Sequence, residues 1–216
     1  MAESSCTASH PSKRSLRGLD WFVFFVADVQ TGFGPFVAVY LTSEKWTQVD
    51  IGLVLTAAGL VGLVGQIAGG ALLDAARSER FVAAIAVALI SVSALAYALW
   101  PIFPVVLAAA CLHAAASCVL GPAIVAISLG LVGPTAIGER LGRNARFASI
   151  GAGLTAGVMG VVGYLISPSA VFFVTAALLI PTWLTLRTIA PREIDPEQAH
   201  GSEPMPRKPN GRQAEP

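Results

Sequence analysis

The chain has 216 residues, of which 55% are hydrophobic and only 12% are charged, and its mean hydropathy is +0.69. Soluble domains carry about 25% charged residues, so this composition excludes an ordinary soluble protein and indicates a membrane protein. No nucleic-acid, phosphate-loop or dinucleotide signature occurs, and the formal net charge of +1 says little about partners. The spacing of Cys6, Cys111 and Cys118 fits neither a metal site nor a CxxC pair. We expect no metal, no cofactor and no nucleic-acid partner.

Six apolar runs are long enough to form bilayer-crossing helices, which need about 20 residues each. They cover residues 19–41, 51–73, 81–100, 104–131, 147–166 and 170–186. The fourth run is long, and we expect its end near residues 130–134 to lie outside the hydrocarbon. The predicted fold is an all-α polytopic membrane protein, with a six-helix bundle over residues 19–189. A polar head (1–18) precedes this bundle, and a disordered tail rich in proline and charge (190–216) follows it.

Lysine and arginine residues predict how the bundle crosses the membrane. If the N-terminus is cytoplasmic, only Lys45 of the 14 Lys and Arg residues falls on the outer side. The positive-inside rule then places both termini in the cytoplasm, in agreement with an even number of spans. The sequence therefore predicts an integral protein of the cell (inner) membrane.

Two features repeat along the chain. The first run contains Gly34-Pro35 and the fourth contains Gly121-Pro122, 87 residues further on, while the second and fifth runs are both rich in glycine. We interpret each Gly-Pro pair as a helix bend, and the chain as two copies of a three-helix unit. An odd number of spans per unit gives the copies opposite orientations, which is the inverted-repeat plan of transporters. Chance is the alternative, because Gly and Pro are common in membrane helices.

This 3+3 organisation resembles the N-terminal half of a major facilitator superfamily transporter. The family's loop motif after the second helix, roughly G-x-L-x-D-R-x-G-R-R, is partly matched by Gly70, Leu72 and Asp74, while its final basic pair is reduced to Arg80. The resemblance implies that this loop forms a cytoplasmic gate and that a mirrored loop does the same. The gate candidates are Gly70, Asp74, Arg77, Arg80, Arg140 and Arg143. In the alternative, the arginines only anchor the inner side or bind anionic lipid head groups.

Asp28 is the only carboxylate well inside a predicted span, where a charge costs about 2.5–3.5 kcal/mol on insertion scales. It lies nine residues into the first run, about 14 Å deep and close to the midplane, and His113 lies equally deep in the fourth. Both helices line the central cavity of the resembled fold. We therefore hypothesise that Asp28 and His113 face one cavity and bind substrate or a proton; structural hydrogen bonds are the alternative. Weaker candidates are Gln30, Gln66 and Ser117.

The glycine-rich runs predict close helix contacts, as in Gly65-x-x-x-Gly69 and Gly153-x-x-x-Gly157. In the resembled family these two helices contact the second half of the transporter; the alternative is packing within this half alone.

Three functions follow from these features. The first is half of a secondary transporter, which moves a small solute by alternating access. It needs a second six-helix half, either as a homodimer partner or as a separate chain. The second is a truncated remnant that inserts in the lipid bilayer without transporting. The third and most remote is an intramembrane enzyme such as a six-helix serine protease, whose Gly-x-Ser-Gly motif does not occur. We expect no enzymatic activity.

Overall fold

The computed structural model describes residues 11–31, 34–74, 76, 78–195 and 199, and these residues form helices and no strand. The helices are α1 (Lys13–Thr31), α2 (Gly34–Ser43), α3 (Gln48–Asp74), α4 (Glu79–Leu99), α5 (Phe103–Leu165), α6 (Ala170–Ala177) and α7 (Leu179–Thr188), followed by the 3-10 turn η1 (Pro191–Glu193). Within the described part, four stretches are long and apolar enough to cross a membrane. They are Gln48–Leu73, Glu79–Leu99, Phe103–Leu165 and Ala170–Thr188.

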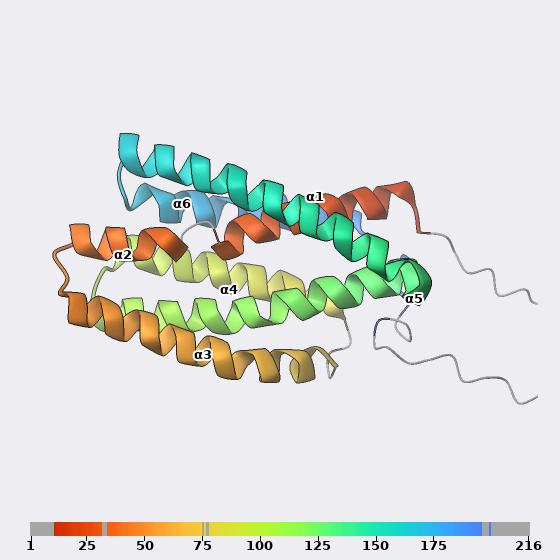
Figure 1. Cartoon of the computed structure of the whole chain (residues 1–216), viewed down its shortest axis with the longest axis horizontal. Coiled ribbons are helices and arrows are strands. Elements are labelled where there is room, and N and C mark those ends of the chain that lie inside the picture. The colour runs from red at the N-terminus through yellow and green to blue at the C-terminus, as the bar shows by residue number, and fades with distance from the viewer. Residues whose placement is uncertain (1–10, 32–33, 75, 77, 196–198, 200–216) are drawn as a thin grey trace, which may run out of the picture.

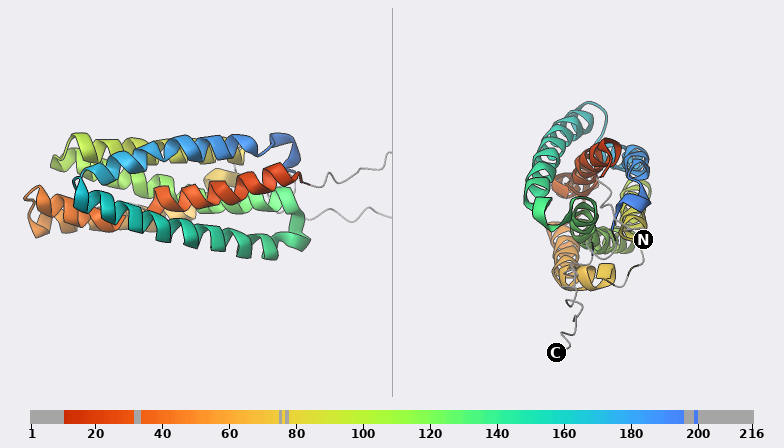
Figure 2. Two further views of the ribbon diagram at one scale, coloured as in Figure 1. Left: turned by 90° about the horizontal axis from the view of Figure 1, so that it is seen from above. Right: turned by 90° about the vertical axis from the view of Figure 1, so that its right-hand side faces the viewer.

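The helices lie along one long axis, and α5 runs the length of the bundle and then returns (Figures 1 and 2). The reversal occurs at Gly133, whose φ of 72° and ψ of 174° are the only non-helical values inside α5. Glycine adopts this region without a steric penalty, and Pro134 has the fixed φ that suits the first turn of a new helix. We therefore describe α5 as a first limb (103–132) and a second limb (134–165). The fourth predicted run ends at this turn, as expected.

The structure also describes the expected cytoplasmic-loop stretch and the two Gly-Pro pairs. The mirrored loop was expected between the fourth and fifth predicted runs, at residues 132–146. This stretch is helical apart from Gly133, and short-range bonds such as that between Arg140 and Asn144 support the helix. The backbone stays helical through Gly121 and Pro122, so this pair does not break the helix. At the other pair, α1 ends at Thr31 and α2 begins at Gly34. Residues 32 and 33 and the side chain of Pro35 lie outside the described residues, so the bend at this pair stays a prediction.

An aromatic cluster joins α2, α4 and α6 near the end of the bundle that is opposite the α5 reversal. The Phe172 ring lies 4.8 Å from the Tyr40 ring and is stacked on Tyr97 at 5.2 Å. The Tyr40 hydroxyl donates to the Tyr97 carbonyl oxygen at 2.9 Å, so the polar atom of this buried ring is satisfied. Aromatic pairs contribute about 0.5–1.5 kcal/mol each beyond their buried area. This cluster thus holds the shorter α2 and α6 against the long α4.

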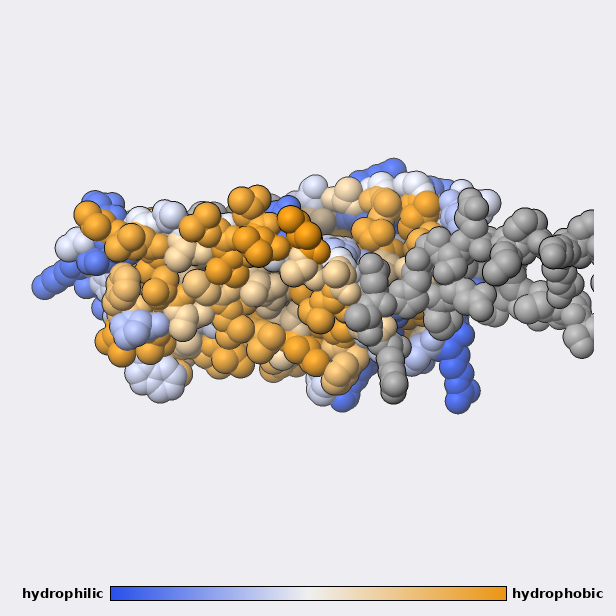
Figure 3. Space-filling model, turned by 90° about the horizontal axis from the view of Figure 1, so that it is seen from below, coloured by the Kyte–Doolittle hydropathy of each residue, from blue (hydrophilic) through white to orange (hydrophobic). Residues whose placement is uncertain are grey.

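The outer surface is apolar over most of its length. Figure 3 shows a hydrophobic zone between more hydrophilic ends on the face of the molecule viewed from below. On α3, Leu63 and Val64 are each 67% exposed, and on the second limb of α5 Ile150 and Val161 are exposed as well. Exposed apolar surface of this extent is costly in water, whereas a bilayer covers it. The protein is an integral membrane protein.

The two polar segments that flank the bundle contact each other at its end. The Glu193 carboxylate accepts hydrogen bonds from the Ser12 backbone N–H at 2.9 Å and from the Ser12 hydroxyl at 3.0 Å. The Ser12 N–H is the main reason that the pKa of Glu193 lies below its ordinary value. The Asp195 N–H donates to the Gly130 carbonyl oxygen at 3.0 Å. The structure thus differs from the predicted boundaries, because α1 begins at Lys13 and residues 190–195 are ordered against the bundle.

Candidate functional site

Asp28 lies on α1 and is only 2% exposed. The second limb of α5 comes so close that a Cβ added to Gly151 would lie 2.9 Å from Asp28 Oδ1 and 2.6 Å from the Phe24 carbonyl oxygen. Only glycine permits that approach. The Thr155 hydroxyl, one turn further along this limb, interacts with the carboxylate. Asp28 Oδ1 itself accepts no hydrogen bond from the described residues.

Three other predicted site residues lie together between α1 and the first limb of α5. The Gln30 side-chain amide donates to the Ser117 carbonyl oxygen at 3.0 Å. Ser117 Oγ lies 3.5 Å from His113 Nε2, one helical turn earlier on the same face. His113 also interacts with the Gln30 backbone. Gln30, His113 and Ser117 therefore form one half-buried polar cluster.

The described contacts do not join Asp28 to His113. Asp28 contacts the second limb of α5, whereas His113 contacts Gln30 and its own limb. Residues two apart on a helix point in different directions, so α1 presents Asp28 to one limb and Gln30 to the other. Gln66, the remaining candidate, lies on the exposed surface of α3.

The gate candidates contact different partners in the structure. Arg80 Nη2 donates to the Leu186 carbonyl oxygen at 2.9 Å, which places a cation at the C-terminal end of α7, where the helix dipole favours it. Gly70 is half-buried, and a Cβ there would meet no atom within 4 Å. Arg77 and the side chain of Asp74 lie outside the described residues.

Arg140 and Arg143 bind Asp20, a residue that the sequence reasoning missed. Arg140 Nη2 lies 2.5 Å from Asp20 Oδ1, and Arg143 Nη2 lies 2.6 Å from Oδ2. Arg140 Nε also donates to Asn144 Oδ1 at 2.9 Å, and the Asn144 amide donates to Ser128 Oγ at 2.9 Å. This Asp20 network ties the start of α1 to the α5 reversal. The sequence does carry one sign of this network: Asp20 is a carboxylate at the edge of an apolar run, and a buried carboxylate needs a cationic partner.

A bundle of apolar helices with a buried carboxylate inside it and a buried ionic network at one end defines a polytopic membrane protein. The family model described as Major Facilitator Superfamily matches residues 21–213. The chain belongs to this superfamily, as its resemblance predicted.

Two curated relatives are each named as an uncharacterized MFS-type transporter, and they come from two strains of Mycobacterium tuberculosis. Each is 34% identical over 201 residues, which is 91% of this chain and 47% of the relative. The chain therefore spans about half the length of the curated relatives it matches. Membership in a family of transporters is consistent with the expectation that the chain is not an enzyme.

Proposed function

We propose that the chain is the N-terminal six-helix half of a secondary transporter, which moves a small solute across the cell membrane by alternating access with a second half. The six spans are α1 with α2, α3, α4, the first limb of α5, the second limb, and α6 with α7. Family membership and the transporter names of both relatives support the transport activity.

A contact between α1 and α5 supports the inverted repeat. The Gly-Pro pairs at Gly34 and Gly121 are offset by 87 residues (121 − 34), and the hydrogen-bonded Gln30 and Ser117 are offset by the same 87 (117 − 30). In two units related by a two-fold axis, a residue meets its own counterpart only near that axis. The Gln30–Ser117 contact is the one expected if the axis passes between α1 and the first limb.

Glycine contacts between the two units support the same plan. A Cβ on Gly65 would lie 2.9 Å from the Cys118 sulfur, and one on Gly69 would lie 2.8 Å from the Cys118 carbonyl oxygen. The second helix of the first unit thus packs on the first helix of the second unit. Gly151 packs the second helix of the second unit on the first helix of the first unit, at Phe24.

The charge distribution supports cytoplasmic termini. The described Lys and Arg residues of α1, of the start of α4, of the α5 reversal and of the end of α7 lie at one end of the bundle (Figure 1). In the described chain, Lys45, between α2 and α3, is the one such residue at the other end. By the positive-inside rule the cation-rich end is cytoplasmic.

The faces left open support a second half. Gly65 and Gly69 are used within this bundle, but a Cβ added to Gly153 or Gly157 would meet no atom within 4 Å. The second limb of α5 therefore presents small residues outward, which allows another helix to approach closely.

Asp28 is the observation that carries the proposal. A carboxylate that is 2% exposed within a membrane bundle, with one oxygen not bonded by the described residues, is costly and is retained mainly for function. We assign it the binding of a proton or of a cationic group of the solute. The cluster of Gln30, His113 and Ser117 supplies hydrogen-bonding groups on the other side of α1.

The test joins this chain to the remaining half of either Mycobacterium tuberculosis relative and reconstitutes the chimera in liposomes that contain a pH-sensitive dye. Sugars, amino acids and amphipathic cations are then added outside. We expect solute-dependent proton movement for the chimera and none for this chain alone. Asp28→Asn should abolish it, whereas Glu44→Gln, at an exposed carboxylate in the turn that follows α2, should leave it unchanged. A silent chimera that is folded would favour a non-transporting remnant, and an Asp28→Asn chimera with normal flux would remove the assigned role.

A further inference from the structure

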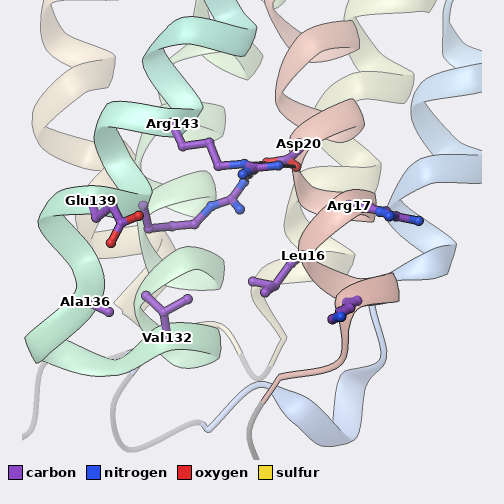
Figure 4. Close-up of a pocket in the computed structure, with 9 residues that line it drawn as sticks. Leu16, Arg17, Asp20, Val132, Ala136, Glu139 and Arg143 are labelled. Carbon is purple, nitrogen blue, oxygen red and sulfur yellow. Dashed lines mark hydrogen bonds and ion pairs between the residues drawn. The ribbon is translucent and has the colours of Figure 1, made fainter.

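A pocket of about 360 Å³ lies between the start of α1 and the α5 reversal. It is lined by Lys13, Leu16, Arg17, Asp20, Val132, Ala136, Glu139, Arg140 and Arg143. Figure 4 shows the Arg143 and Asp20 side chains pointing toward each other from α5 and α1, with Leu16 and Val132 facing the same space. The Arg17 guanidinium points away from Asp20. The pocket thus combines an ionic wall with an apolar one.

The ionic wall holds more positive than negative charge. Two guanidinium groups, of Arg140 and Arg143, share the single carboxylate of Asp20. The Arg140 side chain is only 5% exposed, whereas that of Arg143 is 54% exposed. A buried cation is stable only when an anion compensates it. One carboxylate compensates one of the two arginines, which leaves a positive charge at the inner end of the pocket.

Donor groups are also left over. Arg140 uses Nε for Asn144 and Nη2 for Asp20, and Arg143 uses Nε and Nη2 for Asp20. Both arginines line the pocket, and within the described residues no hydrogen-bond acceptor is found for Nη1 of either one. Paired guanidinium groups with free donors match the oxygens of a phosphate group, which they bind with charge-assisted hydrogen bonds.

The rim contributes opposing charges. Lys13 is exposed and adds a cation, and Glu139 is exposed and adds an anion near Arg143. The apolar side chains of Leu16, Val132 and Ala136 line the rest of the pocket. An amphiphilic ligand with an anionic head would satisfy both walls, and the cation-rich end of the bundle lies where lipid head groups gather.

We propose that this pocket binds a phosphate group, with Arg140 and Arg143 as its ligands and Asp20 as the residue that holds both guanidiniums in position. The phosphate belongs either to the head group of an anionic lipid or to a soluble phosphate compound. This inference does not depend on the transported solute or on Asp28.

The experiment measures the rise in melting temperature of the full chain in neutral detergent during titration with short-chain phosphatidylglycerol, short-chain phosphatidylcholine or inorganic phosphate. We expect phosphatidylglycerol to stabilise the protein more than phosphatidylcholine does. Arg143→Gln should raise the apparent dissociation constant about tenfold, since it removes one charge-assisted contact. Arg146→Gln, an exposed arginine of the same limb that does not line the pocket, should leave that constant unchanged.

A second variant keeps the test decisive if Arg143→Gln does not fold. Glu139→Gln removes the rim anion without breaking a hydrogen bond of the described structure, and it should tighten phosphatidylglycerol binding about twofold by relieving repulsion. Stabilisation by phosphatidylglycerol alone identifies a lipid head group, and equal stabilisation by inorganic phosphate identifies a soluble ligand. Equal effects of Arg143→Gln and Arg146→Gln, or unchanged binding in Glu139→Gln, would overturn the proposal.

Discussion

Replacing Asp20 by asparagine tests whether the Asp20 network stabilises the end of the bundle at which the α5 reversal lies. The substitution keeps the shape of the side chain and removes its charge, so Arg140 is left buried without a compensating anion. Breaking a buried ion pair by removing one partner costs about 3–5 kcal/mol. We expect the lower end, about 3 kcal/mol, because the asparagine oxygen still accepts one hydrogen bond. For a chain of this length that corresponds to a fall in melting temperature of about 6–12 °C.

The assay is thermal unfolding of the purified protein in detergent, followed by helical circular dichroism. Arg143→Gln is the matched control, because its side chain is 54% exposed and an exposed ion pair contributes only about 0–1 kcal/mol. The double variant Asp20→Asn, Arg140→Gln should lose less than the sum of the single losses, since each residue destabilises the structure mainly by orphaning the other. If Asp20→Asn costs no more than Arg143→Gln, the buried arginine does not depend on this carboxylate and the reasoning is wrong.

Three further outcomes are expected. Gly151→Ala should destabilise the protein by about 1–3 kcal/mol, because its Cβ would lie 2.6 Å from a backbone oxygen, whereas Gly153→Ala, with open space around it, should be neutral or stabilising by thermal unfolding. Gly133→Ala should cost about 1–3 kcal/mol by the same measurement, because φ is positive there. The pKa of Glu193 is lowered in the folded protein, so its stabilising contact with Ser12 is present above the unfolded pKa of about 4.3. That contact should be lost as pH falls through the folded value, seen as a smaller protection factor of the Ser12 amide, its exchange rate being compared with the intrinsic rate at each pH.

The apolar runs were predictable because bilayer crossing demands a minimum length of apolar sequence, and length is visible in one dimension. The α5 reversal was also predictable from the sequence, because Gly133 and Pro134 are residues that end one helix and begin the next. The helix over 134–146 was not recognised, because its charged residues read as a loop. Two of these side chains, Arg140 and Arg143, bond Asp20, which lies 120 residues before Arg140, and no local pattern reveals such a partner.

Depth in the membrane and direction around the helix were not equally predictable. Counting residues places Asp28 and His113 at similar depths, because the rise of a helix is constant. The direction of each side chain depends on how the helices are rotated against one another, which is set by packing at residues such as Gly151. That rotation turns Asp28 toward the second limb of α5 and Gln30 toward the first, and equal depth alone does not fix these directions.

The ionisable residues of the bundle do not follow the proposed inverted repeat. Adding the 87-residue offset to Asp28 gives Ala115, and subtracting it from His113 gives Val26, so neither ionisable group has an ionisable counterpart. Gln30 and Ser117, in contrast, are counterparts and bond each other. Two copies of a unit need symmetric contacts to assemble, but a solute pathway needs only one proton-binding or cation-binding group. In the proposed repeat, symmetric residues such as Gln30 and Ser117 serve the assembly of the bundle, and we expect substitution of the asymmetric Asp28 to change the proposed transport without changing the fold.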